Sequence, residues 1–364
     1  MFACTSVPIR EFTSYKQVFA EARAAGEQVL FDYSAAVKEY EQARKLQAGN
    51  SSATRAASAL EIDRPANFDP ATAAADATKL DDVAVRIRAW DTVQRYNDVL
   101  LSLAEGKSVA QVSAAVNGLM QSLATFPLDD IAQAAGMVSP YVAVLREVLA
   151  LGEFERSRRE FVSAVKKGAP LIGVPIRERA ETGDKKTFES FLKLLRDDAQ
   201  NFFNIRKGLN DLAYDHIVDA AADLRRQYRT LLLDYKSNTD LDKLTAAVNE
   251  LLKAVSLPAI ELSAAEKAQA TGVATPLVFS QLVQIKAQIG AQVAAARKKT
   301  GELTAYQSMT AAYVKLIDQV SASLLALLTA VESNLKTIPP IGDLLPVYIQ
   351  LRQAIHFYRD SRGS

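Results

Sequence analysis

The sequence LVQIKAQIGAQVAAARKKTGELTAYQSMTAAYVKLIDQVSASLLALLTAV, residues 282–331, decides the fold of this chain. Apolar residues recur in it at alternating steps of three and four, which places them on one face of a helix. At 1.5 Å per residue this helix would be roughly 80 Å long, so it needs other long helices beside it. We expect the face to be buried throughout, at Leu303 as at Ile317. Its fifteen positions, of which only three are polar, are Leu282, Ile285, Ile289, Gln292, Ala296, Lys299, Leu303, Tyr306, Thr310, Tyr313, Ile317, Val320, Leu324, Leu327 and Val331.

Two further segments carry stripes of comparable length. The first follows the same steps from Phe12 to Ala43, and Gly26 within it lets another helix approach closely. The second, in residues 187–236, has a period of about 3.6, which is typical of a straight helix. Shorter helices are expected over 80–104 and 240–255 and at the C-terminus to about residue 358. Ser263 and Glu266 have the spacing of a capping box.

These patterns predict an all-α fold: an elongated bundle of long antiparallel helices, with shorter apolar helices at one end. We expect residues 1–11 to be an N-terminal tether, residues 12–360 to form a single bundle domain, and residues 361–364 to be a tail. Residues 47–78 are rich in Ala, Ser and Thr and are expected to form a long connection. No strand-like alternation of any length interrupts the helical periods.

A charge-poor segment and a basic segment follow one another in the middle of the chain. Residues 108–145 contain no charge except Asp129 and Asp130, and Pro127 and Pro140 divide them into short helices. Residues 156–186 carry nine basic against four acidic side chains. Residues 108–185 are therefore a candidate end subdomain that contacts an anionic membrane or a partner, unless its helices are buried as a cap on the bundle. The candidate contact residues are Val116, Leu119, Val142, Arg156, Arg158, Arg159, Lys166 and Lys167.

The only cysteine, Cys4, follows Ala3 and precedes a short polar stretch. This context resembles the junction of a bacterial lipoprotein signal peptide, where a small residue precedes the cysteine that receives the lipid. The resemblance covers four to eight residues, and no apolar stretch precedes it in the sequence as given. It implies a signal segment upstream in the natural precursor, a lipid anchor on Cys4, and a location at the periplasmic face of the outer membrane. The alternative is a secreted or cytoplasmic protein with an incidental cysteine.

Composition limits the chemistry that this chain could perform. The two histidines, His216 and His356, occur in no metal-ligand spacing, and a single cysteine cannot build a thiolate cluster. No pattern nominates a general acid, a base or a phosphate loop. A net charge of +1 does not favour a nucleic-acid partner. Seven tyrosines fall on or near the apolar stripes of the long helices, which predicts core packing rather than a ligand site. They are Tyr15, Tyr33, Tyr40, Tyr228, Tyr235, Tyr306 and Tyr313.

We therefore expect a protein without enzymatic activity, metal or cofactor. The leading hypothesis is a cell-envelope helical lipoprotein that acts as scaffold, spacer or adaptor for a protein partner. The alternative is a membrane-active protein that resembles the pore-forming toxins of the cytolysin A type. Those toxins also combine very long helices with an apolar head segment, and the resemblance is one of architecture without a shared motif.

The long stripes predict an extended molecule. Its radius of gyration should clearly exceed the roughly 21 Å of a compact domain of this length. Small-angle X-ray scattering checks this expectation. A compact particle would mean that the long stripes are broken into shorter helices.

Overall fold

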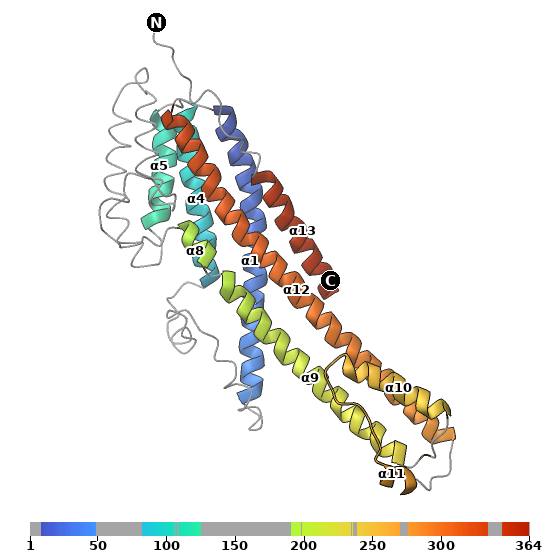
Figure 1. Ribbon diagram of the computed structural model, residues 1–364. Coiled ribbons are helices and arrows are strands. Elements are labelled where there is room, and N and C mark those ends of the chain that lie inside the picture. The colour runs from blue at the N-terminus through green and yellow to red at the C-terminus, as the bar shows by residue number, and fades with distance from the viewer. Residues whose placement is uncertain are drawn as a thin grey trace, which may run out of the picture. The chain divides into compact units, whose positions relative to one another are not determined.

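A computed structural model describes residues 9–48, 82–105, 107, 109–124, 191–197, 199–233, 235, 239–269, 276–333 and 344–363. Every secondary-structure element in these ranges is a helix, so the predicted all-α class is confirmed (Figure 1). The helices are α1 (Ile9–Ala48), α4 (Asp82–Ala104), α5 (Val109–Ala124), α8 (Phe191–Asp197), α9 (Ala199–Leu233), α10 (Thr239–Lys253), α11 (Ala264–Gln269), α12 (Pro276–Ser333) and α13 (Leu344–Arg362).

Most of the expected helix boundaries are confirmed within a few residues. The C-terminal stripe forms a single helix of 58 residues, which continues through Gly301. The helix expected over 187–236 corresponds to α8 and α9. The first two residues of the connection expected over 47–78 belong to α1. The rest of that connection and most of the segment 108–185 lie outside the described residues.

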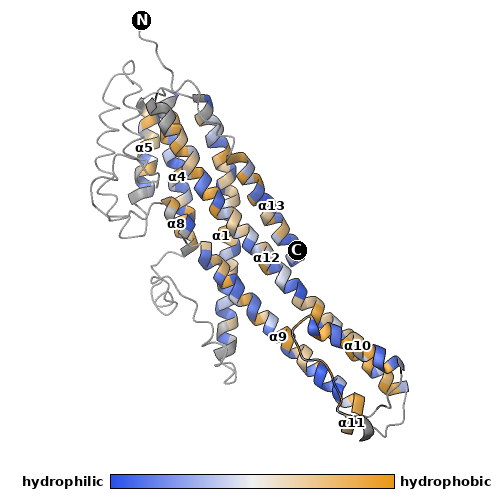
Figure 2. Ribbon diagram, in the orientation of Figure 1, coloured by the Kyte–Doolittle hydropathy of each residue, from blue (hydrophilic) through white to orange (hydrophobic). Residues whose placement is uncertain are grey.

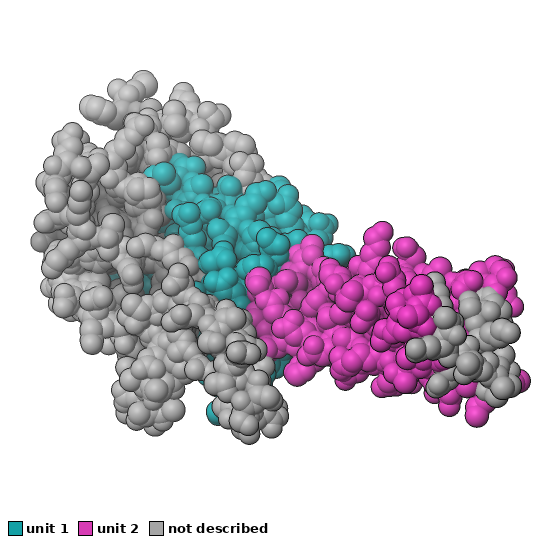
Figure 3. Space-filling view, turned by 60° about the horizontal axis from the view of Figure 1, so that its bottom comes forward, with its two compact units in different colours: residues 1–204, 307–357 teal, residues 205–306, 358–364 magenta. Residues whose placement is uncertain are grey.

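The chain divides into two compact units, coloured separately in Figure 3. Unit 1 comprises residues 1–204 and 307–357, and unit 2 comprises residues 205–306 and 358–364. Both units are therefore assembled from segments that are distant in sequence. The expectation of one domain over 12–360 stays a prediction.

In unit 1, α1 runs in the opposite direction to α4, and the C-terminal part of α12 runs in the opposite direction to α13 (Figure 1). The core of unit 1 is aromatic. Phe19 lies between Tyr15 and Trp90, with ring centroids 6.0 and 5.7 Å away. The Phe202 ring packs between Tyr33 and Tyr313, at 4.2 and 6.0 Å. Large rings thus join α1, α4, α9 and α12 within this unit.

Polar side chains set the register of the unit 1 helices. Arg23 on α1 bonds Asp91 and Gln94 on α4, at 3.1 and 2.5 Å, and also Glu27 in its own helix. The hydroxyls of Thr92 on α4 and Ser122 on α5 are 2.8 Å apart. Because these bonds need specific pairs of residues to be level with each other, they favour one helix alignment over its slipped alternatives.

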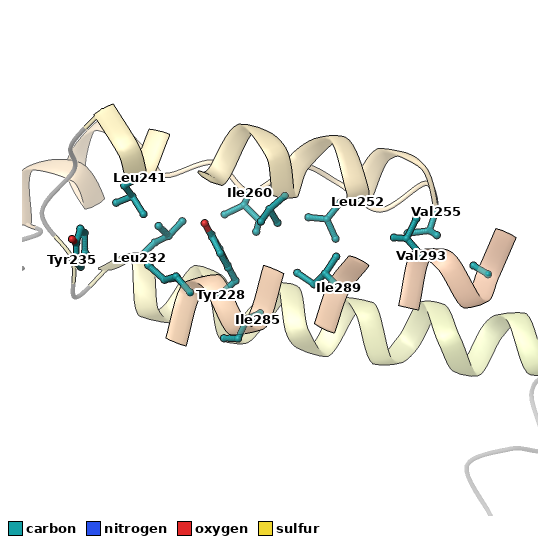
Figure 4. Packing of buried hydrophobic residues seen from close by; sticks show 13 residues of the cluster. Tyr228, Leu232, Tyr235, Leu241, Leu252, Val255, Ile260, Ile285, Ile289 and Val293 are labelled. Atoms are coloured by element: carbon teal, nitrogen blue, oxygen red, sulfur yellow. The ribbon is translucent and has the colours of Figure 1, made fainter. Parts of the chain in front are cut away.

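Unit 2 has a separate core, drawn in Figure 4. Buried side chains from α9, α10, α12 and the segment after α10 point toward one another. The Tyr228 hydroxyl reaches Thr245 on α10 at 3.3 Å, so that its polar end is satisfied while its ring is buried. The cluster consists of Tyr228, Leu232, Tyr235, Leu241, Val248, Leu252, Val255, Ile260, Leu282, Ile285, Ile289, Val293 and Ala296.

The segment after α10 is held by backbone and side-chain bonds. Ser256 has a φ of 57°, and the N–H groups of Ser256 and Leu257 donate to the carbonyls of Lys253 and Leu252 at 3.1 and 3.0 Å. This is a Schellman cap with serine where glycine is usual. Arg225 on α9 then donates to two carbonyls beyond the cap, at 2.6 and 3.0 Å. The turn is therefore fastened to α9 by a charged side chain.

The predicted burial of the apolar stripe on α12 is confirmed on both sides of the middle of the helix, but it is wrong in the middle itself. Ile317 is 1% exposed, but Leu303 is partly exposed, and no side chain is buried from residue 297 to residue 304. This stretch begins with Arg297, Lys298 and Lys299, whose charged ends need water. Lys299 pairs with Glu302 at 2.7 Å. The expectation of continuous burial at Leu303 was therefore wrong.

The predicted capping box of α11 is confirmed, and the stabilisation that Glu266 contributes through it depends on pH. The Ser263 N–H donates to the Glu266 carboxylate at 2.8 Å, and the Glu266 N–H donates to the Ser263 hydroxyl at 3.2 Å. The bonds from Ser263, together with Arg229, lower the pKa of Glu266 below its ordinary 4.5. A lowered folded pKa means that this stabilisation is present above pH 4.5 and is lost as the pH falls through the folded value.

We therefore expect the Glu266 carboxyl to titrate below pH 4.5 in the folded protein. The carboxyl carbon chemical shift, followed by NMR across an acid titration, measures this midpoint. Ser263→Ala should raise it toward the ordinary value, because the hydroxyl bond disappears and the turn that presents the N–H loosens. An unchanged midpoint in Ser263→Ala would contradict the cap as its cause.

Candidate functional site

The described part of the chain contains two of the predicted contact residues. Val116 and Leu119 lie on α5 and are each 3% exposed in the unit 1 core. Val112, one turn before Val116, is also buried. This placement agrees with the alternative in which apolar helices are buried against the bundle, and it makes both residues packing residues in this structure. Outside the described residues lie Cys4, Val142, Arg156, Arg158, Arg159, Lys166 and Lys167.

The predicted core role of the tyrosines is confirmed for six of the seven on the long stripes, and Tyr40 is partly exposed. Burial raises the pKa of Tyr15 far above its ordinary 10, so its hydroxyl stays protonated. The Asn97 side chain opposes part of this shift, although no hydrogen bond of ordinary geometry joins the two groups in the described ranges. Burial likewise raises the pKa of Tyr228. The hydroxyls of Tyr15 and Tyr228 therefore stay protonated near neutral pH, which suits tyrosines that pack in a core and not tyrosines that transfer protons.

The surface of α13 offers the most distinct candidate site of the described residues. Its inner face is buried and includes Leu344, Val347, Leu351 and Ile355. Three of the six large hydrophobic side chains exposed in the described ranges lie on its outer face, which concentrates them on one short helix. Figure 2 shows hydrophobic and hydrophilic residues alternating along α13. Leu345 and Ile349 are each 44% exposed, and Phe357 is 61% exposed.

These three residues share one row of the helix surface. Leu345, Ile349, Gln353 and Phe357 are spaced by four residues, so they form a ridge that runs obliquely along α13. We call this row the α13 ridge. All four side chains are exposed and all belong to unit 1. A helix that is apolar on two faces is usually covered on both of them.

Cations border the α13 ridge on both sides. Arg352 lies on one side of the ridge, where its guanidinium donates to the Tyr348 hydroxyl at 3.2 Å and stacks 5.9 Å from the Tyr348 ring centroid. On the other side Lys315 of α12 donates to the Gln350 amide oxygen at 3.0 Å. Both cations therefore interact with neutral groups. The one acid of α13, Asp360, lies one turn beyond Phe357.

The sequence contains the signal for this surface, although the periodicity of the long stripes obscures it. We expected a final helix to about residue 358 and assigned it no contact. In LLPVYIQLRQAIHFY, residues 344–358, apolar residues occupy more positions than a single buried face requires. Separating the inner set from the outer set needs the orientation of α13, which only the packing in unit 1 supplies.

Searches against protein-family models, curated proteins and solved structures find no match to this chain. Among the helices that the structure describes, none is both long and apolar enough to cross a lipid bilayer. In the same ranges, no three His, Cys, Asp or Glu side chains gather as they would to hold a metal ion.

Proposed function

We propose that this chain is a non-enzymatic helical scaffold or adaptor of the bacterial cell envelope, which is held at a membrane by lipid on Cys4 and binds a protein partner. The observation that carries the proposal is the use of its large aromatic side chains. Trp90, Tyr15, Tyr228, Tyr306 and Tyr313 are each at most 1% exposed. Ring contacts join Trp90 to α1, Tyr306 to α13 and Tyr313 to α9. Side chains that often line ligand sites are thus used to hold long helices together.

Long helices with extended buried stripes suit a spacing or presenting role. The buried stripes of α1 and α12 extend over many turns, and charged bonds such as that of Arg23 with Asp91 fix helix register. A bundle of this kind supports exposed helix faces at defined positions, which is what an adaptor needs. We place the protein at the periplasmic face of the outer membrane, on the basis of Ala3 and Cys4.

Fractionation of the native host tests the location. Wild type should partition with membranes and Cys4→Ser should not, because several acyl chains hold a protein stably where a thiol does not. Mass spectrometry of the native protein should find a diacylglyceryl group on Cys4. Equal partitioning of the two forms would defeat the lipoprotein proposal.

Vesicle leakage separates this proposal from the membrane-active alternative. The burial of Val116 and Leu119 supports the scaffold, since an apolar head would have to leave the unit 1 core before it entered a bilayer. Wild type should therefore leave dye-loaded vesicles of anionic phospholipid intact. Rapid release of the dye at low protein concentration would favour the toxin-like alternative.

A further inference from the structure

The α13 ridge has the geometry of one half of a helix–helix contact. Rows of side chains four apart are the ridges by which two helices most often interlock, at an angle of about −50° in this class of packing. Leu345, Ile349 and Phe357 supply the projecting side chains of the row. The inner residues of α13 already occupy the opposite face in the core of unit 1. An occupant of the outer face would therefore come from another molecule or from a segment outside the described ranges.

The charges beside the α13 ridge identify the chemistry of that occupant. Arg352 and Lys315 stand on either side of the row, and each is bound to a neutral group, the Tyr348 hydroxyl and the Gln350 amide. A carboxylate on each edge of an incoming helix would give these cations charge-assisted bonds in a partly dehydrated interface. Phenylalanine and arginine are also residue types that protein interfaces favour.

We propose that the α13 ridge binds an amphipathic helix of a partner protein, which carries an apolar row flanked on both edges by Asp or Glu. This proposal rests on the proposed adaptor function and names the chemistry of the partner. The partner's apolar row lies between Leu345 and Phe357, and its carboxylates meet Arg352 and Lys315. Gln353, inside the row, forms a hydrogen bond with a polar group of the partner's helix.

Two other occupants fit the surface less well. A second copy of this chain would present Arg352 and Lys315 again, and so would bring cations where carboxylates are needed. A bilayer could attract the cations, but its acyl chains would leave the exposed amide of Gln353, which lies inside the row, without a hydrogen-bond partner. A protein helix can satisfy both the two cations and the Gln353 amide.

Binding of designed peptides to the full-length protein tests the proposal. The probe is a fluorescent synthetic peptide of about 20 residues, long enough for partial helicity. It has leucine at every fourth position and glutamate along both edges of the leucine row. The comparison peptide has lysine in place of each glutamate. We expect the acidic peptide to bind, with an affinity that falls as salt rises, and the basic peptide not to bind.

Variants on the exposed ridge should change binding without unfolding the protein. The double variant Ile349→Ser/Phe357→Ser should lower the affinity for the acidic peptide by about tenfold or more, as expected for central interface residues. The matched control is Phe31→Ser on α1, where an equally exposed aromatic lies outside the ridge. It should bind as wild type does. Arg352→Glu/Lys315→Glu should transfer the preference to the basic peptide.

Several outcomes would overturn the proposal. They are equal binding of both peptides, binding that the ridge variants leave unchanged, ridge-dependent binding to anionic phosphatidylglycerol vesicles without peptide binding, and ridge-dependent self-association in sedimentation.

Photo-crosslinking in the native host distinguishes failure of the α13 proposal from failure of the adaptor function. A crosslinker in place of Gln353 should capture an acidic helical protein, while one in place of Ala246 on the outer face of α10 should not. Capture from α10 alone would sink the α13 proposal and leave the adaptor function standing.

Discussion

Ile317→Asp is expected to lower the free energy of unfolding by about 4 kcal/mol or more, because it puts a carboxylate into a dry core. Ile317 is 1% exposed, and its neighbours on the stripe, Tyr313 and Val320, are fully buried. An aspartate there must either stay ionised without water or take up a proton, and both cost stability. The midpoint of urea denaturation, followed by circular dichroism, measures the loss.

Leu303→Asp in the same helix is the matched control. Leu303 is partly exposed, and it lies among residues that water already reaches. Its variant should therefore lose clearly less stability than Ile317→Asp, although the sequence pattern places both residues on the same stripe. Equal losses would show that residues 297–304 are buried in solution and that the middle of α12 has a neighbour.

The contrast between Leu303 and Ile317 shows how far periodicity predicts this fold. A repeat of three and four residues identifies the helix and the face, because both follow from local geometry. It does not say which turns of that face have neighbours, since those neighbours come from distant parts of the chain. The capping box at Ser263 was predictable because all of its groups lie within four residues.

The candidate surface was harder to predict than the fold. A ridge is exposed only where no other part of the chain covers it, and the sequence of α13 alone does not show this. It does not indicate that Ile349 is exposed and Leu351 buried. The former is 44% exposed and the latter fully buried, although both are large and aliphatic. The same limit applies to Val116 and Leu119, since an apolar segment with few charges is equally compatible with a core and with a membrane contact.

The contact between Gly26 and Trp90 is expected to show the second large effect. Trp90 is fully buried, and its indole N–H has no hydrogen-bond partner among the described residues, so its contribution comes from packing. Trp90→Ala should lower the free energy of unfolding by about 3–5 kcal/mol. A Cβ atom at position 26 would lie 2.9 Å from Cζ2 of the indole, so the ring fits only against glycine.

Gly26→Ala should therefore destabilise the wild type by about 1–3 kcal/mol through overpacking, although alanine is the better helix former by about 1 kcal/mol. In the Trp90→Ala background the obstacle is gone, and the same change should become neutral or stabilising. Gly301→Ala is the control, because nothing lies within 4 Å of a Cβ atom there. It should stabilise both backgrounds by up to about 1 kcal/mol. If Gly26→Ala stabilised the wild type as Gly301→Ala does, α1 and α4 could not be packed as closely as the structure has them.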